Sequence, residues 1–396
     1  MYRVTKKLWA ALAVGRRDGL QALRHFDFRG GSLPVFDDLV HLDAAMTWLC
    51  LAQDVCSGAG VSAAYSLYKG WDVAYPETSG YIIATFLAYA DLHGDDHYVH
   101  RAEQLGRWEL DIQAENGGVL SSPAVSYTRV FNTGQVILGW CALFERTADE
   151  QYLAAAVRAG DYLLQLQELD GSWEQDTYCG ARTYHARVAW ALIRLGRLSG
   201  MTVFIDSARN NLKWVLARQE VNGWFRDCGF HEDDPITHVI VYTLRGLLES
   251  HVAGGADVSD LGLSASVECA AGAICTALAR SPIFGIGGML PAFFSADWTS
   301  RSTYSCLTGN AQLACLLLRL AQVTGNDTYR LPALQLMTAI KQTHSVATRI
   351  DSVRGAVAGS FPLYGGYCPN VFPNWATKFF ADALMMQIDQ KTLIRA

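Results

Sequence analysis

Two histidines and several tyrosines stand where apolar helical segments are predicted to begin. His185 and His238 lie at or within one residue of the start of two such segments, with Tyr184 and Tyr242 close by. An imidazole titrates near neutral pH and an activated phenol can also take or return a proton, so these side chains suit acid–base chemistry at a carbon atom. A histidine at a helix start is also a common structural hydrogen-bonding group, and that alternative stays open.

The turns that lead into six apolar segments concentrate aromatic, amide and cationic side chains. This mixture suits a sugar, because the C–H face of a sugar ring packs on aromatic rings while its hydroxyl groups form hydrogen bonds. Helix capping would explain the Asn and Asp residues but not so many Trp, Tyr, His and Arg residues. We predict that the following residues bind the sugar: Trp71, Asp72, Tyr75, Asn132, Arg187, Asp233, Asp234, Tyr242, Arg301, Tyr304, Asn374, Trp375 and Lys378.

Charged side chains add two further possibilities. Arg187, Arg245, Arg301 or Lys378 could bind the carboxylate of a uronic acid and stabilise an enediolate, while His185, His238, Tyr184 and Glu77 are our catalytic candidates. Glu77 follows a proline at a predicted helix start, where an acidic residue is stabilising in any case. Hydrolysis would need two carboxyl groups across a cleft. The candidates for that pair are Asp72 or Glu77 opposite Asp233 or Asp234, with Glu174 and Asp176 also available.

Six segments that would position these residues share one pattern. Each begins with small or polar residues and becomes apolar over several helical faces, which is typical of a helix enclosed by protein. The spacing is regular: Gly80 to Gly134 is 54 residues, Gly134 to Ala186 is 52 and Ala186 to Ile240 is 54. The predicted inner helices are Ser79–Tyr89, Thr133–Phe144, Tyr184–Leu195, His238–Glu249, Thr308–Leu320 and Asn374–Met385.

A second marker has the same period. More amphipathic segments follow three of the inner helices, and each closes with a glutamine and a glycine turn, at Gln113, Gln167 and Gln219, which are 54 and 52 residues apart. Two markers with one period indicate repeated helical hairpins. Residues 1–26 are predicted as a basic amphipathic helix and Val35–Val55 as an apolar one, and we expect these N-terminal helices to pair with the last inner helix and close a ring.

This pattern resembles the (α/α)6 toroids, which include six-hairpin glycosidases, toroid polysaccharide lyases and uronyl epimerases, and the N-acylglucosamine 2-epimerase group. The resemblance covers about residues 35–390 and implies an all-α protein, a single domain over residues 1–396, with the turns before the inner helices gathered on one face. The turn 167–173 also resembles the QW motif of terpenoid cyclases. Glu232-Asp233-Asp234 departs from their DxDD motif, because His231 occupies the first Asp position.

Composition excludes several other classes. The chain has 396 residues, is 51 % hydrophobic and carries a net charge of −6 without a basic stripe, so a nucleic-acid partner is not expected. No run approaches the roughly 18 uncharged apolar residues of a membrane span, and we expect a cytoplasmic protein. The ten cysteines include no CxxC pair and fit buried thiols. Metal-binding and nucleotide-binding motifs are absent, so neither a metal nor a cofactor is expected.

We therefore predict an enzyme that acts on an oligo- or polysaccharide containing uronic acid, as a lyase or epimerase that abstracts a proton. Glycoside hydrolysis by a carboxylate pair, a terpenoid-cyclase-like reaction and non-catalytic sugar binding are the alternatives. We further expect His185 and His238 to face one cleft together with Trp71, Glu77, Tyr184 and Trp375. The sequence does not indicate an oligomeric state.

Overall fold

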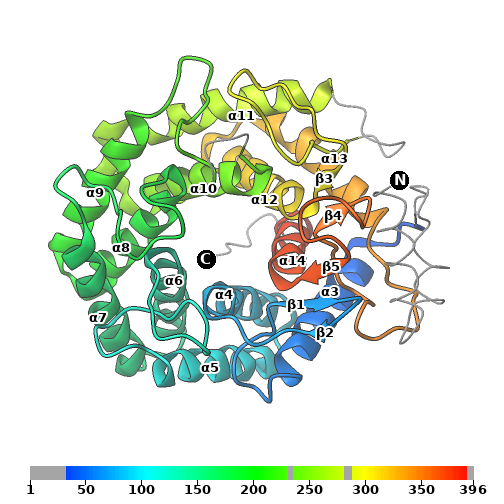
Figure 1. The fold of residues 1–396 in the computed structure, drawn as a ribbon, viewed down its shortest axis with the longest axis horizontal. Helices are drawn as coiled ribbons and strands as arrows, with labels where there is room; N and C mark the ends of the chain where they lie inside the picture. The colour runs from blue at the N-terminus through cyan, green and yellow to red at the C-terminus, as the bar shows by residue number, and fades with distance from the viewer. Residues whose placement is uncertain (1–32, 231–234, 281–287, 390–396) are drawn as a thin grey trace.

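A computed structural model describes residues 33–230, 235–280 and 288–389, which form two concentric rings of helices (Figure 1). This part of the chain contains twelve α-helices, and the prediction of an all-α toroid of helical hairpins is confirmed. The inner helices are α4 (Pro76–His93), α6 (Val130–Thr147), α8 (Ala186–Ser199), α10 (Thr237–Gly254), α12 (Leu307–Thr324) and α14 (Asn374–Ile388). The outer helices are α3 (Asp38–Asp54), α5 (Asp96–Asp111), α7 (Glu150–Leu166), α9 (Thr202–Leu216), α11 (Leu263–Ala279) and α13 (Arg330–Lys341).

Burial explains which helices lie inside. Every residue of α4 from Pro76 to Ala90 is buried, whereas α5 buries only one stripe. A helix that is apolar all round loses the most accessible surface when other helices surround it, while an amphipathic helix keeps its polar face in water. The segment Thr133–Phe144 accordingly lies in inner helix α6, as predicted.

The repeated glutamines join each hairpin to the next. The Gln113 side-chain amide donates to the carbonyl of Gly117 at 2.8 Å within its own turn and to the carbonyl of Ala155 on α7 at 3.0 Å. Gln167 makes the same pair of bonds one repeat later, to Gly171 and to Ser207 on α9, both at 3.0 Å. One side chain thus satisfies a turn carbonyl and a carbonyl of the following outer helix, which gives the periodic glutamine a physical reason.

Glycine lets the inner helices approach each other closely. A Cβ atom added at Gly139 of α6 would lie 2.2 Å from the carbonyl oxygen of Gly80 on α4. One added at Gly246 of α10 would lie 2.4 Å from the carbonyl carbon of Ala186 on α8, and one added at Gly309 of α12 would lie 2.8 Å from the backbone nitrogen of His238 on α10. These are backbone atoms, which cannot move aside as a flexible side chain can. The ring therefore depends on small residues at the helix crossings.

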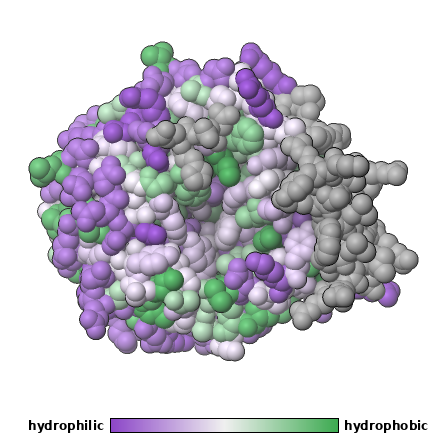
Figure 2. Space-filling model, viewed as in Figure 1, coloured by the Kyte–Doolittle hydropathy of each residue, from purple (hydrophilic) through white to green (hydrophobic). Residues whose placement is uncertain are grey.

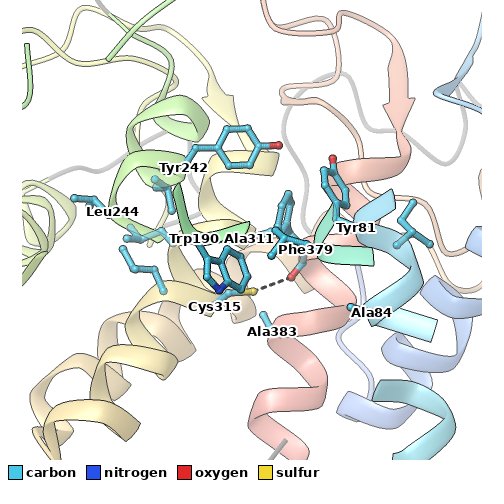
Figure 3. Packing of buried hydrophobic residues seen from close by; sticks show 14 of the residues in the cluster. Tyr81, Ala84, Trp190, Tyr242, Leu244, Ala311, Cys315, Phe379 and Ala383 are labelled. Carbon is cyan, nitrogen blue, oxygen red and sulfur yellow. Dashed lines mark hydrogen bonds between the residues drawn. The ribbon is translucent and has the colours of Figure 1, made fainter. Parts of the chain in front are cut away.

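Side chains from opposite parts of the ring meet on its axis, below the face shown in Figure 1. Tyr81 of α4, Trp190 of α8, Tyr242 of α10 and Phe379 of α14 point toward the same central region (Figure 3). The Cys315 thiol of α12 donates to the carbonyl oxygen of Phe379 at 3.2 Å, the dashed line in Figure 3. The centre of the ring is a packed core below the helix starts.

Two small sheets join loops at the face where the inner helices begin. Strand β1 (Ala64–Ser66) pairs antiparallel with β2 (Gly70–Trp71) and with β5 (Val371–Pro373), so loops of the first and last hairpins lie side by side. A second pair joins β3 (Ser305–Cys306) to β4 (Ser360–Phe361). Helix α3 packs against α14. The helix predicted over residues 1–26 lies outside the described residues, and the extent of the domain stays a prediction.

All ten cysteines are free thiols. In the described part of the chain, no single helix has both the length and the apolar character that a membrane span needs. Within these residues, one pair of segments, Thr237–Leu261 and Leu263–Ala279, has the required length and apolar composition when taken together, but the pair is bent by 104°.

The helix crossings generate a first prediction. Gly246→Ala places a methyl group against the backbone of Ala186, and we expect the variant to lose about 1–3 kcal/mol of unfolding free energy because the inner ring must open locally. Gly272→Ala is the matched control, since it lies on outer helix α11 with nothing within 4 Å of an added Cβ. That change should raise stability by about 0.5–1 kcal/mol. Urea unfolding measures both, and equal effects of the two substitutions would contradict the packing described here.

A candidate active site at the centre of the ring

The second residue of four inner helices lines one cavity. Glu77 of α4, Phe131 of α6, His238 of α10 and Trp375 of α14 all hold this position. The face of the molecule is hollowed near its centre, whereas strongly hydrophilic residues gather toward the periphery (Figure 2). The cavity has a volume of about 510 Å³, within the range of small-molecule sites. Its remaining lining comes from loops and from the adjacent helical turns: Tyr75, Tyr178, Cys179, Tyr184, Phe230, Tyr242 and Tyr367.

Among the described residues that line the cavity, Glu77 provides the carboxyl group. Pro76 fixes the start of α4, and Tyr75 precedes it in an extended conformation, so both side chains are held by the helix start. The Tyr75 hydroxyl donates to Glu77 Oε2 at 2.8 Å and lies 2.6 Å from the Tyr178 hydroxyl. Tyr178 in turn donates to Asn132 Oδ1 at 2.8 Å, and the Asn132 amide donates to the carbonyl of Leu120 at 3.2 Å. A chain of oxygens therefore runs from Glu77 to Asn132.

Enclosure changes the titration of Glu77. Burial raises the pKa of its carboxyl group from the ordinary 4.5 to about 7, because a carboxylate loses hydration at this site. The Tyr75 hydrogen bond, the positive charge of Arg187 and the Tyr178 hydroxyl each oppose that rise in pKa. Both protonation states of Glu77 are consequently populated near neutral pH, which is the condition for a group that both takes and gives a proton.

His238 is held in the neutral form by the same enclosure. Burial lowers the pKa of its imidazole to about 3. Its ring lies among Phe230, Tyr242 and Tyr367, with ring centroids 5.8, 5.4 and 5.1 Å away, and Nδ1 has no hydrogen-bond partner. The His238 ring is therefore a neutral part of the cavity wall, and its Nδ1 is buried.

Arg187 supplies positive charge next to the cavity without lining it. Its Nε donates to Gln135 Oε1 at 2.8 Å, and its guanidinium stacks between Trp190 and Tyr242, 5.3 and 5.1 Å from the ring centroids. Arginine keeps its charge in proteins, so this cation acts on Glu77 through the packed core. Arg187 is the second residue of α8, which is the equivalent position to Glu77 and His238 on their helices.

The structure brings together six of the residues predicted from sequence. Glu77, Tyr75, Tyr184, His238, Tyr242 and Trp375 line the cavity, and Asn132 reaches it through Tyr178. Their chemical roles stay predictions. Asp233 and Asp234 lie outside the described residues, although Phe230, the last described residue before them, is part of the lining.

The expectation that both histidines face one cleft is wrong for His185. It belongs to a 3-10 turn, η1 (Thr183–His185), that precedes α8, and it is buried against Trp173 and Tyr184 rather than in the cavity lining. Trp71 is also elsewhere, since it packs on Trp48 and Tyr65 beside the β1–β2 hairpin. Asp72 of the same hairpin is exposed and accepts a hydrogen bond from the backbone amide of its neighbour Val73.

Most of the predicted cations are engaged away from the cavity. Lys378 is fully buried and donates to Asp382 at 2.6 Å, one turn further along α14, and Arg245 pairs with Glu249 in the same way on α10. Arg301 is exposed. Asn374 and Tyr304 support loops: the Asn374 amide donates to Ser62 and Thr78, and Tyr304 packs against Phe293 and Gly366. Neither Lys378 nor Arg245 is therefore part of the cavity lining.

Several lining residues were not among our predicted site residues. Tyr178 and Tyr367 come from loops without any periodic pattern, and Phe131 and Phe230 read as ordinary core residues in the sequence. The repeat period could have predicted Phe131, because this residue lies 54 positions after Glu77, at the equivalent place in the next hairpin. Among the described residues, no group of three His, Cys, Asp or Glu side chains could hold a metal ion.

Comparison with known proteins supports the fold. No protein-family model matches the chain, and no curated protein matches it. The solved structure of unsaturated glucuronyl hydrolase from Bacillus sp. GL1 is similar, with a TM-score of 0.71 and 14 % identity over 90 % of this chain and 98 % of that chain. Cellobiose 2-epimerase from Bacillus thermoamylovorans B4167 gives 0.69 and 9 % over 86 % and 95 %, respectively. A sugar epimerase from a ruminal bacterium gives 0.68 and 11 % over 87 % and 98 %. Both predicted groups, the six-hairpin glycosidases and the epimerases, thus share this architecture.

The raised pKa of Glu77 makes stability depend on pH. The contribution of protonated Glu77 to the free energy of unfolding is complete below the ordinary pKa of 4.5. It is lost as the pH rises through about 7, because the folded protein then carries a poorly hydrated charge. Glu77→Gln removes that loss. Between pH 5 and pH 8.5, we expect the variant to gain about 2–3 kcal/mol of unfolding free energy relative to the parent protein. Urea unfolding at the two pH values measures this, with the exposed Glu115→Gln as control; a pH-independent difference for Glu77→Gln would show that this carboxyl group does not titrate as described.

Proposed function

We propose that this protein is an enzyme that acts on a carbohydrate, with Glu77 as the group that transfers a proton. The observation that supports the proposal most is the placement of Glu77, a carboxyl group with a pKa of about 7, in the wall of an aromatic cavity. The proteins of similar fold include an unsaturated glucuronyl hydrolase and two sugar epimerases, which also favours carbohydrate chemistry.

The cavity walls suit a sugar ring. The rings of Trp375 and Tyr75 make an edge contact, with their centroids 6.3 Å apart. The Trp375 indole donates to the Tyr367 hydroxyl at 2.8 Å, and this bond fixes the orientation of the Trp375 and Tyr367 rings. Aromatic faces can pack on the C–H face of a pyranose. Fixed rings bind at a low cost in conformational entropy, because they lose little freedom when the ligand arrives.

The preferred reaction is proton abstraction from a uronyl sugar. Ionised Glu77 takes the proton from the carbon next to the carboxyl group, and the electron pair of the C–H bond moves into an enediolate. Return of a proton to the opposite face gives the epimer. Alternatively, the enediolate collapses with cleavage of the C–O bond on the next carbon; the leaving oxygen takes that electron pair and a proton, and an unsaturated uronyl end remains. Arg187 lies close enough to stabilise negative charge at Glu77, since its charge lowers the pKa of that carboxyl group.

One observation favours an acid-first reaction, such as hydrolysis, as the second candidate. Glu77, Tyr75, Tyr178 and Asn132 make three oxygen–oxygen contacts of 2.6–2.8 Å, and each contact needs one proton. The two phenols supply two protons. With Tyr75 donating to ionised Glu77 and Tyr178 donating to Asn132, the contact between the two phenols has no proton. Protonation of Glu77 supplies one, because Glu77 can then donate to Tyr75 and Tyr75 to Tyr178. This count favours an acidic Glu77 at rest, and a hydrolase would need a second carboxyl group as well.

Product analysis distinguishes these reactions. Incubation with a panel of uronic-acid polysaccharides in deuterated water is read for deuterium at the sugar carbon, for absorbance of an unsaturated uronyl product, and for new reducing ends. We expect deuterium uptake or absorbance, and a loss of at least about 10²-fold in turnover for Glu77→Gln. The matched control is Glu109→Gln, another buried carboxyl group, on outer helix α5. Reducing ends alone would favour hydrolysis, and an unaffected Glu77→Gln variant would refute the role of Glu77.

The hydrogen-bond chain makes a separate prediction for Tyr178→Phe. Without the Tyr178 hydroxyl, Glu77 loses one of the groups that oppose the rise in its pKa. The pKa of Glu77 should therefore rise further, by on the order of one unit, and the corresponding limb of the pH–activity profile should move to higher pH. Tyr152→Phe, which removes a phenol near α5 and α7, serves as the control. A shift to lower pH would mean that Tyr178 does not stabilise the carboxylate form of Glu77.

A further inference from the structure

Arg129 lies between two tyrosines next to the cavity. Its guanidinium carbon is 4.6 Å from the ring centroid of Tyr127 and 5.2 Å from that of Tyr178, a residue of the cavity lining. The backbone of Arg129 is fixed, because its amide donates to the carbonyl of Val119 at 2.9 Å and its carbonyl accepts from the amide of Thr133 at the start of α6. The cation is therefore presented on a rigid support.

The described residues provide Arg129 with no ion pair. No carboxylate oxygen of this part of the chain lies within 4.0 Å of its guanidinium, and its Nε is buried without a hydrogen-bond partner. The nearby Asp176 is engaged elsewhere, since it accepts from Thr128 and Tyr162 at 3.1 and 2.8 Å. Arg182, another cation beside the cavity lining, differs in pairing with Asp227 at 3.9 Å. Arg129 has planar donor groups that no protein acceptor uses, and such groups match a carboxylate.

Tyr178 connects this cation to the reacting group. One ring face of Tyr178 packs on Arg129, and its hydroxyl lies 2.6 Å from that of Tyr75, which in turn lies 2.8 Å from Glu77. Tyr127 is 49 % exposed, so the stack extends from the cavity lining toward solvent. Arg129 therefore packs on the ring whose hydroxyl belongs to the hydrogen-bond chain that ends at Glu77.

We propose that Arg129, Tyr127 and Tyr178 form a binding subsite for the carboxylate of a second uronic acid, the sugar next to the one at Glu77. This inference rests on the proposed function and specifies its substrate as an oligouronide with acidic groups on neighbouring sugars. Arg187, Arg245 and Lys378 are bound to Gln135, Glu249 and Asp382, respectively, whereas the described part of the chain gives Arg129 no such polar partner. The flanking rings provide a surface for the C–H face of the second sugar.

Matched ligands test the subsite. Tetrasaccharides of galacturonic acid, of mannuronic acid and of guluronic acid are each compared with their methyl esters, which keep the sugars and remove the charge. Binding is measured by isothermal titration on full-length protein carrying Glu77→Gln, so that no ligand is consumed. At least one acid should bind about tenfold more tightly than its ester, and Arg129→Gln should abolish that preference. The preference should also weaken at high salt.

Two controls separate the possible results. Arg280→Gln makes the same change in net charge at an exposed position at the end of α11 and should leave the preference intact. Arg129→Lys keeps the charge but loses the planar stack between the rings, so we expect it to recover only part of the preference. Acids and esters that bind equally well, with no effect of Arg129→Gln, would overturn the subsite and leave the proposed function standing. Failure of every tetrasaccharide to bind would count against both.

Discussion

Backbone contact between neighbouring inner helices is the constraint on which the rest of the structure depends. Gly139 of α6 reaches the carbonyl of Gly80 on α4, and Gly246 of α10 reaches the backbone of Ala186 on α8, at distances that exclude any side chain. Because neighbouring helices lie this close, the inner ring is narrow. Because the hairpins repeat, the inner helices begin at equivalent positions around the ring. As a result, the second residues of α4, α6, α10 and α14 meet at one cavity, although they are far apart in the sequence.

The narrow ring also sets the charge states at the site. Exclusion of water raises the pKa of Glu77 and lowers that of His238, so both groups are driven toward neutral forms by the same physical cause. Arg187 remains charged below the cavity, stacked on Tyr242 and bonded to Gln135. The site therefore combines a titrating acid, a neutral imidazole and a fixed positive charge, an arrangement suited to moving protons within a carbohydrate.

Sequence periodicity predicted the fold well and the site only in part. The spacing of Gly80 and Gly134 reflects the backbone contacts themselves, which is why it located the inner helices. Locating the site required the register to within one residue. His185 was taken as the equivalent of His238, but α8 begins at Ala186, so Arg187 occupies that position. One residue turns a side chain by about 100° around a helix, which is enough to move it from a cavity to the core.

Loop residues set the remaining limit on prediction. Tyr178 and Tyr367 reach the cavity from segments without regular structure, where no period connects sequence position with direction. Lys378 illustrates the opposite case: it lies on the expected helix, but one turn below the cavity, bound to Asp382. The central claim is that enclosure by the ring raises the pKa of Glu77, so that its carboxyl group titrates near neutral pH. Infrared difference spectra between the parent protein and Glu77→Gln, recorded from pH 4 to pH 9, measure this directly through the carbonyl band of a protonated carboxyl group. A band present at pH 5 and lost with a midpoint near 7 is the predicted result, whereas a band already absent at pH 5.5 would contradict the account.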